Sequence, residues 1–362
     1  MKRSVERLPE GVVPHPKPAP VQATTGIVML TIGADADGMR VDRYLSAHFP
    51  TVSFTHLQRV IRKGELRVDG KRVDPKDRLA EGQLLRIPPM KLVVEPSKER
   101  STAKDAETRE FIESITLYED DDVLVLNKPM GLAVQGGSGT TRHIDGMLDA
   151  LPQPNGQRAR LVHRIDKDTS GCLLIAKTRA AASALTKSFR TRSTRKVYWA
   201  LVAGLPKLKQ GRISTYLAKD EEAEEAGQAK MKVAEHGDDG ASHALTYYAV
   251  VEHAGKIASW VSLKPVTGRT HQLRAHMASI DHPIIGDEKY FDLKVLKQHD
   301  WELPPDIPNK LHLVARRIAI PHPRGRGIID VTAPLPPHML QSWSLLGFDA
   351  TRFDPIEEAP EE

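Results

Sequence analysis

Apolar positions near the start of the chain recur every three or four residues, which is the spacing of one face of an α-helix. They are Val41, Tyr44, Leu45 and Phe49, followed by Leu57, Val60 and Ile61. Ser53 is a suitable N-cap for the second helix. The Asp69-Gly70 pair predicts a hairpin, and a strand at residues 84–87 follows it. Residues 28–90 therefore predict a small α/β domain of two helices and a small sheet.

Beyond residue 111 the pattern changes, because short apolar runs bounded by glycine, proline and polar clusters outnumber helical repeats. The runs that predict strands cover residues 123–126, 172–176, 197–204, 243–255, 256–268, 311–323 and 328–334. Helical spacing is found at residues 179–189 and 269–280. Many successive strands could pair antiparallel, which favours an α+β fold with a mixed, mainly antiparallel sheet over residues 111–346.

Three segments lie outside these two patterns. Residues 1–27 are rich in proline and predict a disordered tail. Residues 91–110 are polar and bounded by proline, so we expect a linker there, with one short strand at residues 91–94. Residues 347–362 end in EEAPEE and predict an acidic C-terminal tail. A chain of 362 residues is long enough for the two domains that this division predicts.

The composition excludes several classes of protein. Hydrophobic residues make up 40% and charged residues 27% of the chain, as is usual for globular proteins. No apolar run is long enough to cross a bilayer, and the N-terminal residues lack the apolar core of a secretory signal. The single cysteine, Cys172, excludes internal disulfides and a cysteine-rich metal site. We expect a cytoplasmic protein without a membrane partner, acting as a monomer.

The net charge of +5 is modest, and the distribution of charge is more informative than its sum. Residues 40–72 carry eight lysines or arginines against three acids, and residues 187–196 carry five cations and no acid. Arginines also gather at residues 316–326, whereas acids collect at residues 219–226 and in the C-terminal tail. Any one cluster is typical of a solvated face. Three of them, with the acids kept apart, favour a polyanionic partner.

The sequence HRIDKDTSG, residues 163–171, crowds the carboxylates of Asp166 and Asp168 among cationic side chains, directly before an apolar run. One interpretation is a magnesium site, because D-x-D-x-T occurs in haloacid-dehalogenase-type phosphatases. Such phosphatases need an apolar strand that ends at the first aspartate, and here the strand follows instead. Neighbouring cations would also compete with the metal. The residues therefore do not favour a metal site.

Two other interpretations remain open on the residues alone. Asp166 could belong to a structural salt bridge, which is the common fate of an aspartate beside an arginine. Asp166 could also be a nucleophile, held at the mouth of a buried strand and kept ionised by an arginine from elsewhere. Residues that could serve the second interpretation are Tyr198 on a predicted strand, Arg269 in a turn and Arg274 on the helix that follows.

Five motifs in order resemble the RluA-type pseudouridine synthases. They are Lys128-Pro129-x-Gly131, the signature H-R-I-D-K-D-T-S-G, K-x-Y-x-A at residues 196–200, G-R-T-H-Q-L-R-A-H at residues 268–276 and H-P-I-I-G-D at residues 282–287. The signature departs from the family pattern in one position, where Ile165 replaces leucine. The resemblance covers about residues 115–340. Residues 39–88 resemble an S4 RNA-binding domain, which precedes the catalytic domain in members that act on large-subunit ribosomal RNA.

The resemblance implies a role for each matching residue. Asp166 would be the catalytic nucleophile, Arg274 its cationic partner, and Tyr198 the ring that stacks on the target base. Arg164 would fill the space left by the flipped uridine, while Lys128, Arg269 and His271 would shape the RNA site. The S4-like domain would present Arg43, Arg59, Arg62, Lys63 and Lys71 to phosphates. Asp168 would not be catalytic, since the family leaves that position open.

The implied reaction isomerises uridine to pseudouridine without a metal or a cofactor. The N1–C1′ bond breaks, the base rotates, and a C5–C1′ bond forms. Attack at C1′, addition at C6 and a glycal intermediate all remain open as the first step. The expected substrate is 23S ribosomal RNA, free or in an assembling large subunit. The alternatives are a transfer RNA substrate, or a non-catalytic RNA-binding assembly factor on the same scaffold.

Overall fold

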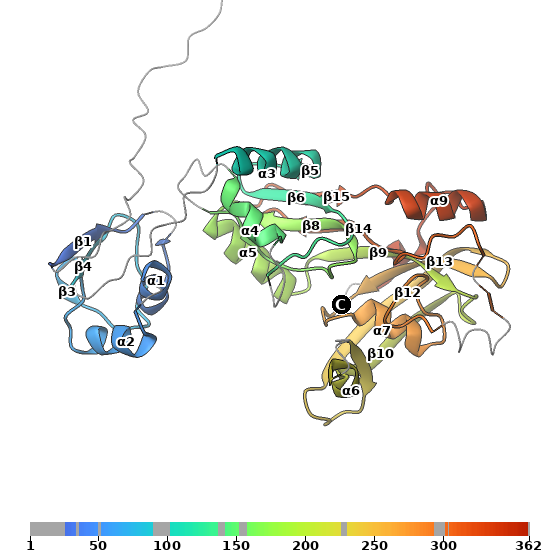
Figure 1. Ribbon diagram of the computed structural model, residues 1–362, viewed down its shortest axis with the longest axis horizontal. Coiled ribbons are helices and arrows are strands. Elements are labelled where there is room, and N and C mark those ends of the chain that lie inside the picture. The colour runs from blue at the N-terminus through green and yellow to red at the C-terminus, as the bar shows by residue number, and fades with distance from the viewer. Residues whose placement is uncertain are drawn as a thin grey trace, which may run out of the picture. The chain divides into compact units, whose positions relative to one another are not determined.

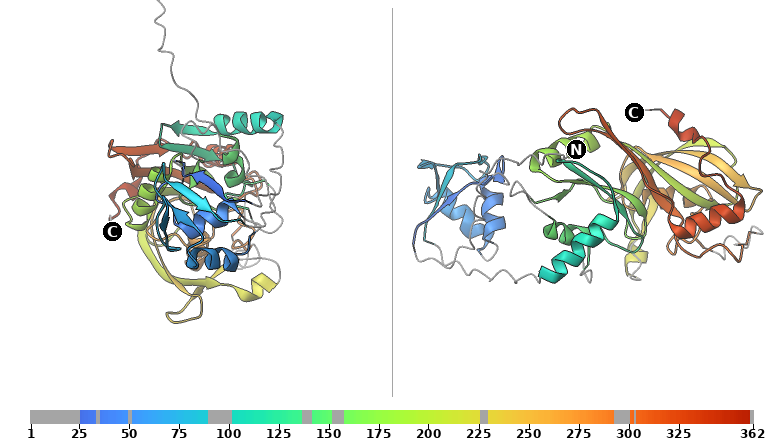
Figure 2. Two further views of the ribbon diagram at one scale, coloured as in Figure 1. Left: turned by 90° about the vertical axis from the view of Figure 1, so that its left-hand side faces the viewer. Right: turned by 90° about the horizontal axis from the view of Figure 1, so that it is seen from above.

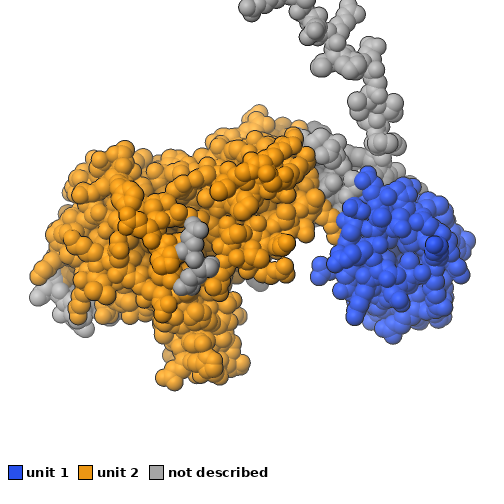
Figure 3. Space-filling model, turned by 180° about the vertical axis from the view of Figure 1, so that it is seen from behind, with its two compact units in different colours: residues 1–102, 153–157 blue, residues 103–152, 158–362 orange. Residues whose placement is uncertain are grey.

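The computed structural model describes residues 26–33, 36–49, 52–89, 102–136, 142–151, 158–225, 230–292, 301–302 and 304–360. The chain forms two compact units, coloured separately in Figure 3. One spans residues 1–102 with 153–157, and the other spans residues 103–152 with 158–362. Most of the expected disordered tail and the expected short strand at residues 91–94 lie outside the described residues.

The first unit has the predicted helices and hairpin. Its elements are β1 (Val28–Thr31), α1 (Val41–His48), α2 (Phe54–Arg62), β2 (Arg67–Val68), β3 (Lys71–Arg72) and β4 (Leu84–Ile87). The strands form an antiparallel sheet in the order β1-β4-β2-β3. Ser53 caps α2 through the amide of His56, and the hairpin turns at Asp69 and Gly70, both with positive φ. The α/β expectation for this unit is therefore confirmed.

The second unit is built on one sheet of eleven strands, ordered β11-β10-β12-β13-β9-β14-β8-β6-β5, with β15 paired to β14 and β7 to β8. The strands are β5 (Thr116–Glu119), β6 (Val123–Lys128), β7 (Arg160–Leu161), β8 (Ser170–Ala176), β9 (Arg195–Ala203), β10 (Gln210–Lys219), β11 (Met231–Ala234), β12 (Ser242–Ala254), β13 (Ala258–Pro265), β14 (Leu313–Pro321) and β15 (Ile328–Thr332). Only β14 and β8 pair in parallel among the described strands. The mainly antiparallel α+β prediction is confirmed.

Helices cover this sheet on both sides, and Figures 1 and 2 show how strongly the sheet twists between its ends. They are α3 (Thr102–Ser114), α4 (Ile144–Met147), η2 (Leu148–Ala150), α5 (Arg179–Arg190), α6 (Glu221–Glu225), α7 (Gln272–Ser279), α9 (Pro337–Leu346) and η3 (Pro355–Glu358). None of these described helices combines the length and the apolar character that a membrane crossing requires.

The alternation of side chains along β9 separates two apolar layers. Trp199 faces a cluster that includes Trp260 and, from α9, Trp343. Ala200 faces the opposite cluster, which includes Leu273 of α7. Successive side chains of a strand point to opposite faces, so Tyr198 lies on the α7 side of the sheet. This register decides which face of the sheet can carry a site.

Gly171, the second residue of β8, lies at a point where no side chain fits. Its φ is +102°, and a Cβ there would lie 2.3 Å from the carbonyl oxygen of Ala315. The close approach is part of the parallel pairing between β8 and β14, in which Gly171 lies opposite Ala315. A glycine at this position therefore lets β8 enter the sheet immediately after the loop that carries Asp166.

Two expected boundaries differ from the structure. The linker predicted for residues 91–110 is helical from Thr102, where α3 begins, and α3 belongs almost wholly to the second unit. The segment predicted as an acidic tail packs against the sheet as far as residue 360. Asp354 accepts hydrogen bonds from Trp199 and Ser262 at 2.7 Å each, and Ile356 is buried. Polar composition misled both predictions, and in the C-terminal segment Asp354 and Glu357 have partners on the domain.

Candidate active site

A cleft of about 600 Å³ opens on the α7 side of the sheet. The loop before β8, the end of α5, strand β9 and the turn before α7 form its walls, and these elements can be followed in Figure 1. Its cationic lining residues are Arg164, Arg190, Arg192, Lys196, Arg269 and Arg274. Among the described lining residues, Asp166 supplies the one carboxylate. This imbalance of charge suits an anionic ligand.

Asp166 and Arg274 meet in this cleft. Nη1 of Arg274 lies 3.8 Å from Oδ2 of Asp166, whose side chain is 27% exposed. The Arg274 side chain is 4% exposed. Burial acts to lower the pKa of Arg274, but the hydrogen bonds and charge of Asp287, with the charge of Asp166, raise it overall. The cation is therefore permanent, and one of its edges faces Asp166.

Asp287 holds Arg274 more closely than Asp166 does. Its two oxygens accept from Nε and Nη2 of Arg274 at 2.7 and 2.6 Å, a bidentate pair with the Asp287 side chain fully buried. Oδ1 of Asp287 also accepts from the amides of Lys289 and Tyr290. Asp287 belongs to the motif at residues 282–287, but the sequence alone indicated no role for it. The sequence signal was an aspartate placed directly after apolar residues and a glycine. A carboxylate buried in such a segment needs a cation or amide donors.

Gly286 places Asp287 in this position. Its φ is +73°, and a Cβ would come within 2.0 Å of the carbonyl oxygen of Lys310. Glycine is thus required both by the backbone conformation and by the close approach of a neighbouring segment. The turn delivers the Asp287 carboxylate to α7, which orients the Arg274 side chain toward the cleft.

Tyr198 projects from β9 into the same cleft, opposite Leu263 of β13 in the sheet register. Burial raises the pKa of its hydroxyl well above the usual range, and the charge of Asp166 acts in the same direction. The phenol therefore stays protonated at neutral pH. A neutral ring with a hydroxyl donor is suited to stacking on a base and to donating a hydrogen bond.

The structure corrects our assignment of Lys128 as an RNA-binding residue. Its side chain is fully buried, and Nζ donates to the carbonyl oxygens of Pro129, Leu132 and Lys167 at 2.8 to 2.9 Å. Burial lowers the pKa of Lys128 to about 7, although the charges of Asp168 and Asp166 oppose this effect. The ammonium has no donor left for RNA. It ties the loop that contains Asp166 to the turn after β6.

His163 is a further structural residue that the sequence did not indicate. Its Nε2 accepts a hydrogen bond from the amide of Leu174 at 2.8 Å, and its ring stacks on Phe189. Burial and the charge of Lys196 lower the pKa of His163 to about 3, so the imidazole is neutral. It continues the pairing of β7 along β8 and fixes the start of the loop that carries Asp166.

The turn before α7 is organised by Gln272. Its Oε1 accepts from the amide of Arg269 at 3.0 Å and from the hydroxyl of Thr267 at 2.7 Å, while Nε2 donates to the carbonyl of Leu245. Arg269 donates through Nε to the carbonyl of His243. The sequence alone indicated no role for Gln272, whose buried side-chain amide fixes the position of the Arg269 backbone.

The remaining predicted residues of this turn lie at the cleft. Arg164 is exposed and reaches Oγ1 of Thr270 at 3.1 Å from the opposite wall. His271 has φ +50°, and its Nδ1 lies 3.3 Å from the hydroxyl of Tyr290. Tyr290 in turn lies beside the Arg274 guanidinium, 5.4 Å from the ring centroid. Asp168, by contrast, does not line the cleft.

The cations predicted to contact RNA in the first unit lie at its surface. Arg59, Arg62 and Lys63 are exposed along α2, and Arg43 is exposed on α1. The opposite side of α2 buries Leu57, Val60 and Ile61. The helix is therefore amphipathic, with its cations available to a polyanion. Lys71 is exposed in the hairpin.

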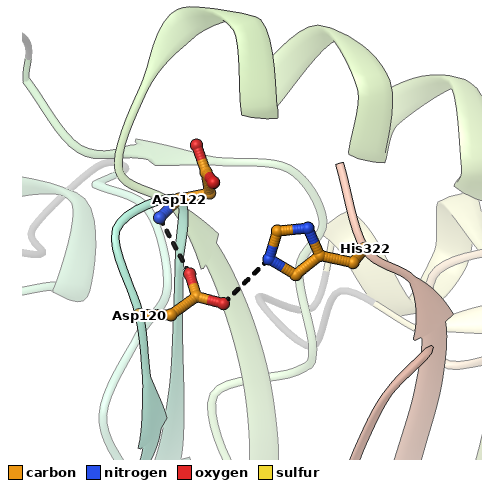
Figure 4. Close-up of side chains that lie close together, drawn as sticks. All are labelled: Asp120, Asp122 and His322. Atoms are coloured by element: carbon orange, nitrogen blue, oxygen red, sulfur yellow. Dashed lines mark hydrogen bonds and ion pairs between the residues drawn. The ribbon is translucent and has the colours of Figure 1, made fainter. Parts of the chain in front are cut away.

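One group of side chains has the composition of a metal site, and it lies at the turn between β5 and β6. It comprises Asp120, Asp122 and His322 (Figure 4). Asp120 accepts four hydrogen bonds, from Tyr118, His322 and the amides of Asp122 and Val123, and these outweigh burial to lower its pKa to about 2.

The second carboxylate of the group, Asp122, faces Nε of Arg324 at 2.7 Å. His322 also uses both ring nitrogens, since Nδ1 accepts from the amide of Arg324. Every lone pair of Asp120 is engaged and a guanidinium lies beside Asp122. This cluster therefore clamps the β5–β6 turn to the end of β14 rather than holding a cation.

Comparisons with protein families and with individual relatives point to the same family. Residues 122–279 match the family described as RNA pseudouridylate synthase, and residues 39–85 match the S4 domain. The chain is 36% identical to ribosomal large subunit pseudouridine synthase C of Pasteurella multocida (strain Pm70), over 86% of this chain and 92% of the relative. It is 34% identical to the protein of the same name from Escherichia coli (strain K12), over 86% and 94%.

A solved structure shares the fold. Human RNA pseudouridylate synthase domain containing 4 is 26% identical, with a TM-score of 0.54, and the match covers 68% of this chain and 98% of the human one. The match leaves about the length of the first unit of this chain uncovered.

Proposed function

The chain belongs to the RNA pseudouridylate synthase family, and on that premise we propose that it converts uridines of large-subunit ribosomal RNA into pseudouridines. The relatives are named for the large ribosomal subunit, which supports 23S ribosomal RNA as the substrate. The reaction is an isomerisation: the N1–C1′ bond breaks, C5 bonds to C1′, and the proton lost from C5 balances the proton gained by N1. Nothing else is added or removed.

The observation that carries this proposal is the pairing of Asp166 with Arg274 at 3.8 Å inside a cleft of about 600 Å³. A partly exposed carboxylate beside a permanent cation has a counter-charge and remains reachable by a substrate. The volume is in the range of pockets that enclose a small molecule or a single nucleotide. A stacked, paired uridine hides its glycosidic bond, so the target nucleotide must leave its helix to enter.

We assign the remaining roles from the positions of the side chains. Tyr198 supports the flipped base and offers a hydroxyl donor close to Asp166. Arg164, exposed at the mouth of the cleft, is placed to occupy the space that the flipped uridine leaves in the RNA. Arg269 and His271 shape the wall opposite. Asp287 is a positioning residue, because it acts on the substrate through Arg274.

The S4 unit would add affinity through phosphate contacts, which supply little sequence information. Replacing Arg59, Arg62 and Lys63 together by glutamine should reduce the slope of log affinity against log salt concentration by about two. The reason is that RNA binding then neutralises fewer phosphates and releases fewer counterions. The measurement is binding of a 23S ribosomal RNA fragment over a salt series. A variant with Lys76→Gln and Lys104→Gln, both exposed outside α2, should keep the wild-type slope. An unchanged slope in the α2 variant would place the RNA elsewhere.

The function itself is tested by pseudouridine mapping. Ribosomal and transfer RNA from cells that lack this protein should lose pseudouridine at specific positions of 23S RNA, and the wild-type gene should restore them. Loss confined to transfer RNA would reassign the substrate. Loss at no position, together with a growth or assembly defect, would favour a non-catalytic assembly factor. We further propose that the enzyme acts in the cytoplasm, as a monomer.

A further inference from the structure

Lys196 is a cation of the cleft that the reaction outlined above does not use. It lies on β9 two residues before Tyr198, and both side chains line the cleft. The two-residue period of a strand places them on the same face of the sheet, next to one another. Lys196 is half-buried, and its charge acts on His163 in the same wall.

Other buried cations near the cleft have partners. Arg274 has two carboxylates, and the Lys128 ammonium has three carbonyl oxygens. Arg195, the neighbour of Lys196 on the other face of β9, pairs with Glu357 at 3.0 Å. Lys196 has neither a hydrogen bond nor an ion pair among the described residues of the chain, and burial alone lowers its pKa to about 8. A desolvated cation without a counter-charge is stabilised by an anionic ligand.

The surroundings of Lys196 indicate what that ligand is. Arg190 ends α5, Arg192 lies in the turn that leads to β9, and both line the same cleft as Lys196. The one carboxylate among the described lining residues, Asp166, has its ion pair with Arg274, and no ion pair joins it to Lys196 among the described residues. Uracil is neutral at physiological pH. The excess of positive charge therefore matches the phosphates on either side of the base.

We propose that Lys196 binds a phosphate that flanks the flipped uridine, with Arg190 and Arg192 extending this contact along the RNA backbone. The inference rests on the proposed function, since it assumes that a nucleotide occupies the cleft with its base on Tyr198. An ammonium is a compact point charge that suits a phosphate oxygen. Its place beside Tyr198 would align the sugar of the target with Asp166, and so fix the position of the glycosidic bond.

The test uses a stem-loop of ribosomal RNA that contains a uridine converted by the wild-type enzyme. One phosphate, either 5′ or 3′ to that uridine, is replaced by a neutral methylphosphonate. Lys196→Met should raise the dissociation constant of the unmodified RNA about tenfold or more, as for loss of a hydrogen bond between charged groups. On saturating RNA its rate should change far less than its affinity, because the contact is made before and during reaction alike.

The double substitution separates a phosphate contact from a structural role. Neutralising the contacted phosphate should weaken binding by wild-type enzyme, but should cost Lys196→Met no further affinity. Lys196→Arg should keep most of the affinity. Lys187→Met is the matched control, since Lys187 is exposed on α5 and does not line the cleft; it should respond to the methylphosphonates as wild type does.

Two results would overturn the assignment. One is that a neutral linkage on either side of the uridine leaves binding by the wild-type enzyme unchanged. This measurement requires no variant. The other is that both neutral linkages weaken the wild type and Lys196→Met by equal factors. Failure of the proposed function itself looks different, because the wild-type enzyme would then convert no uridine in the unmodified RNA.

Discussion

Asp166→Asn should abolish turnover while leaving RNA binding intact or tighter. The rate should fall by at least about a thousand-fold, as it does when a nucleophile is removed from an enzyme that depends on it. Affinity should not fall, because the substitution removes the one carboxylate among the described residues that line a cleft with six cations. The measurements are pseudouridine formation and binding of the same ribosomal RNA fragment.

Asp168→Asn is the control for this experiment. Asp168 belongs to the same nonamer but does not line the cleft, so its variant should remain active. The two aspartates are two residues apart in the sequence, but only Asp166 lines the cleft. Restoration of every lost pseudouridine by Asp166→Asn in cells would show that the reaction does not use this carboxylate.

The Arg274→Ala variant should be both less stable to unfolding and inactive. It leaves Asp287, whose side chain is 0% exposed, without its guanidinium. Removing one partner of a buried pair costs about 3–5 kcal/mol, so the midpoint of denaturant unfolding should move clearly downward. Asp166 would also lose the guanidinium that lies 3.8 Å from it.

A double variant distinguishes the two effects. Arg274→Gln combined with Asp287→Asn removes both buried charges, keeps the side chains similar in size and should regain much of the lost stability. It should remain inactive, because Asp166 still lacks a guanidinium. Wild-type stability in Arg274→Ala would contradict the buried clamp. Recovery of activity in the double variant would show that Arg274 serves only the fold.

Much of the fold could be predicted from local sequence. The spacing of Leu57, Val60 and Ile61 predicted α2, and the glycine-bounded apolar runs predicted β8 and the β12–β13 hairpin. These signals are local, since a helix face, a strand or a tight turn is specified within a few residues. The motifs also placed Asp166, Tyr198 and Arg274 among the candidate residues.

Other elements were missed because their signal is not local. Helix α3 begins inside the predicted linker, and its polar composition resembles that of a solvated segment. The residues after Leu346 contain the same acids as a free tail, yet Asp354 is held by Trp199 and Ser262 from two different strands. Such partners lie far away in the sequence, so composition could not reveal them.

The sequence by itself determined the periodicity of the elements, the turn positions and the order of the motifs. Tertiary structure alone decided that Asp287 forms a hydrogen-bonded ion pair with Arg274 and that Lys128 is buried against three carbonyl oxygens. It also decided that Lys196 faces the cleft without a partner among the described residues. The physical reason is that the role of a charged side chain depends on how far it is desolvated and on which groups surround it. Those neighbours come from strands and turns that meet only when the sheet has formed.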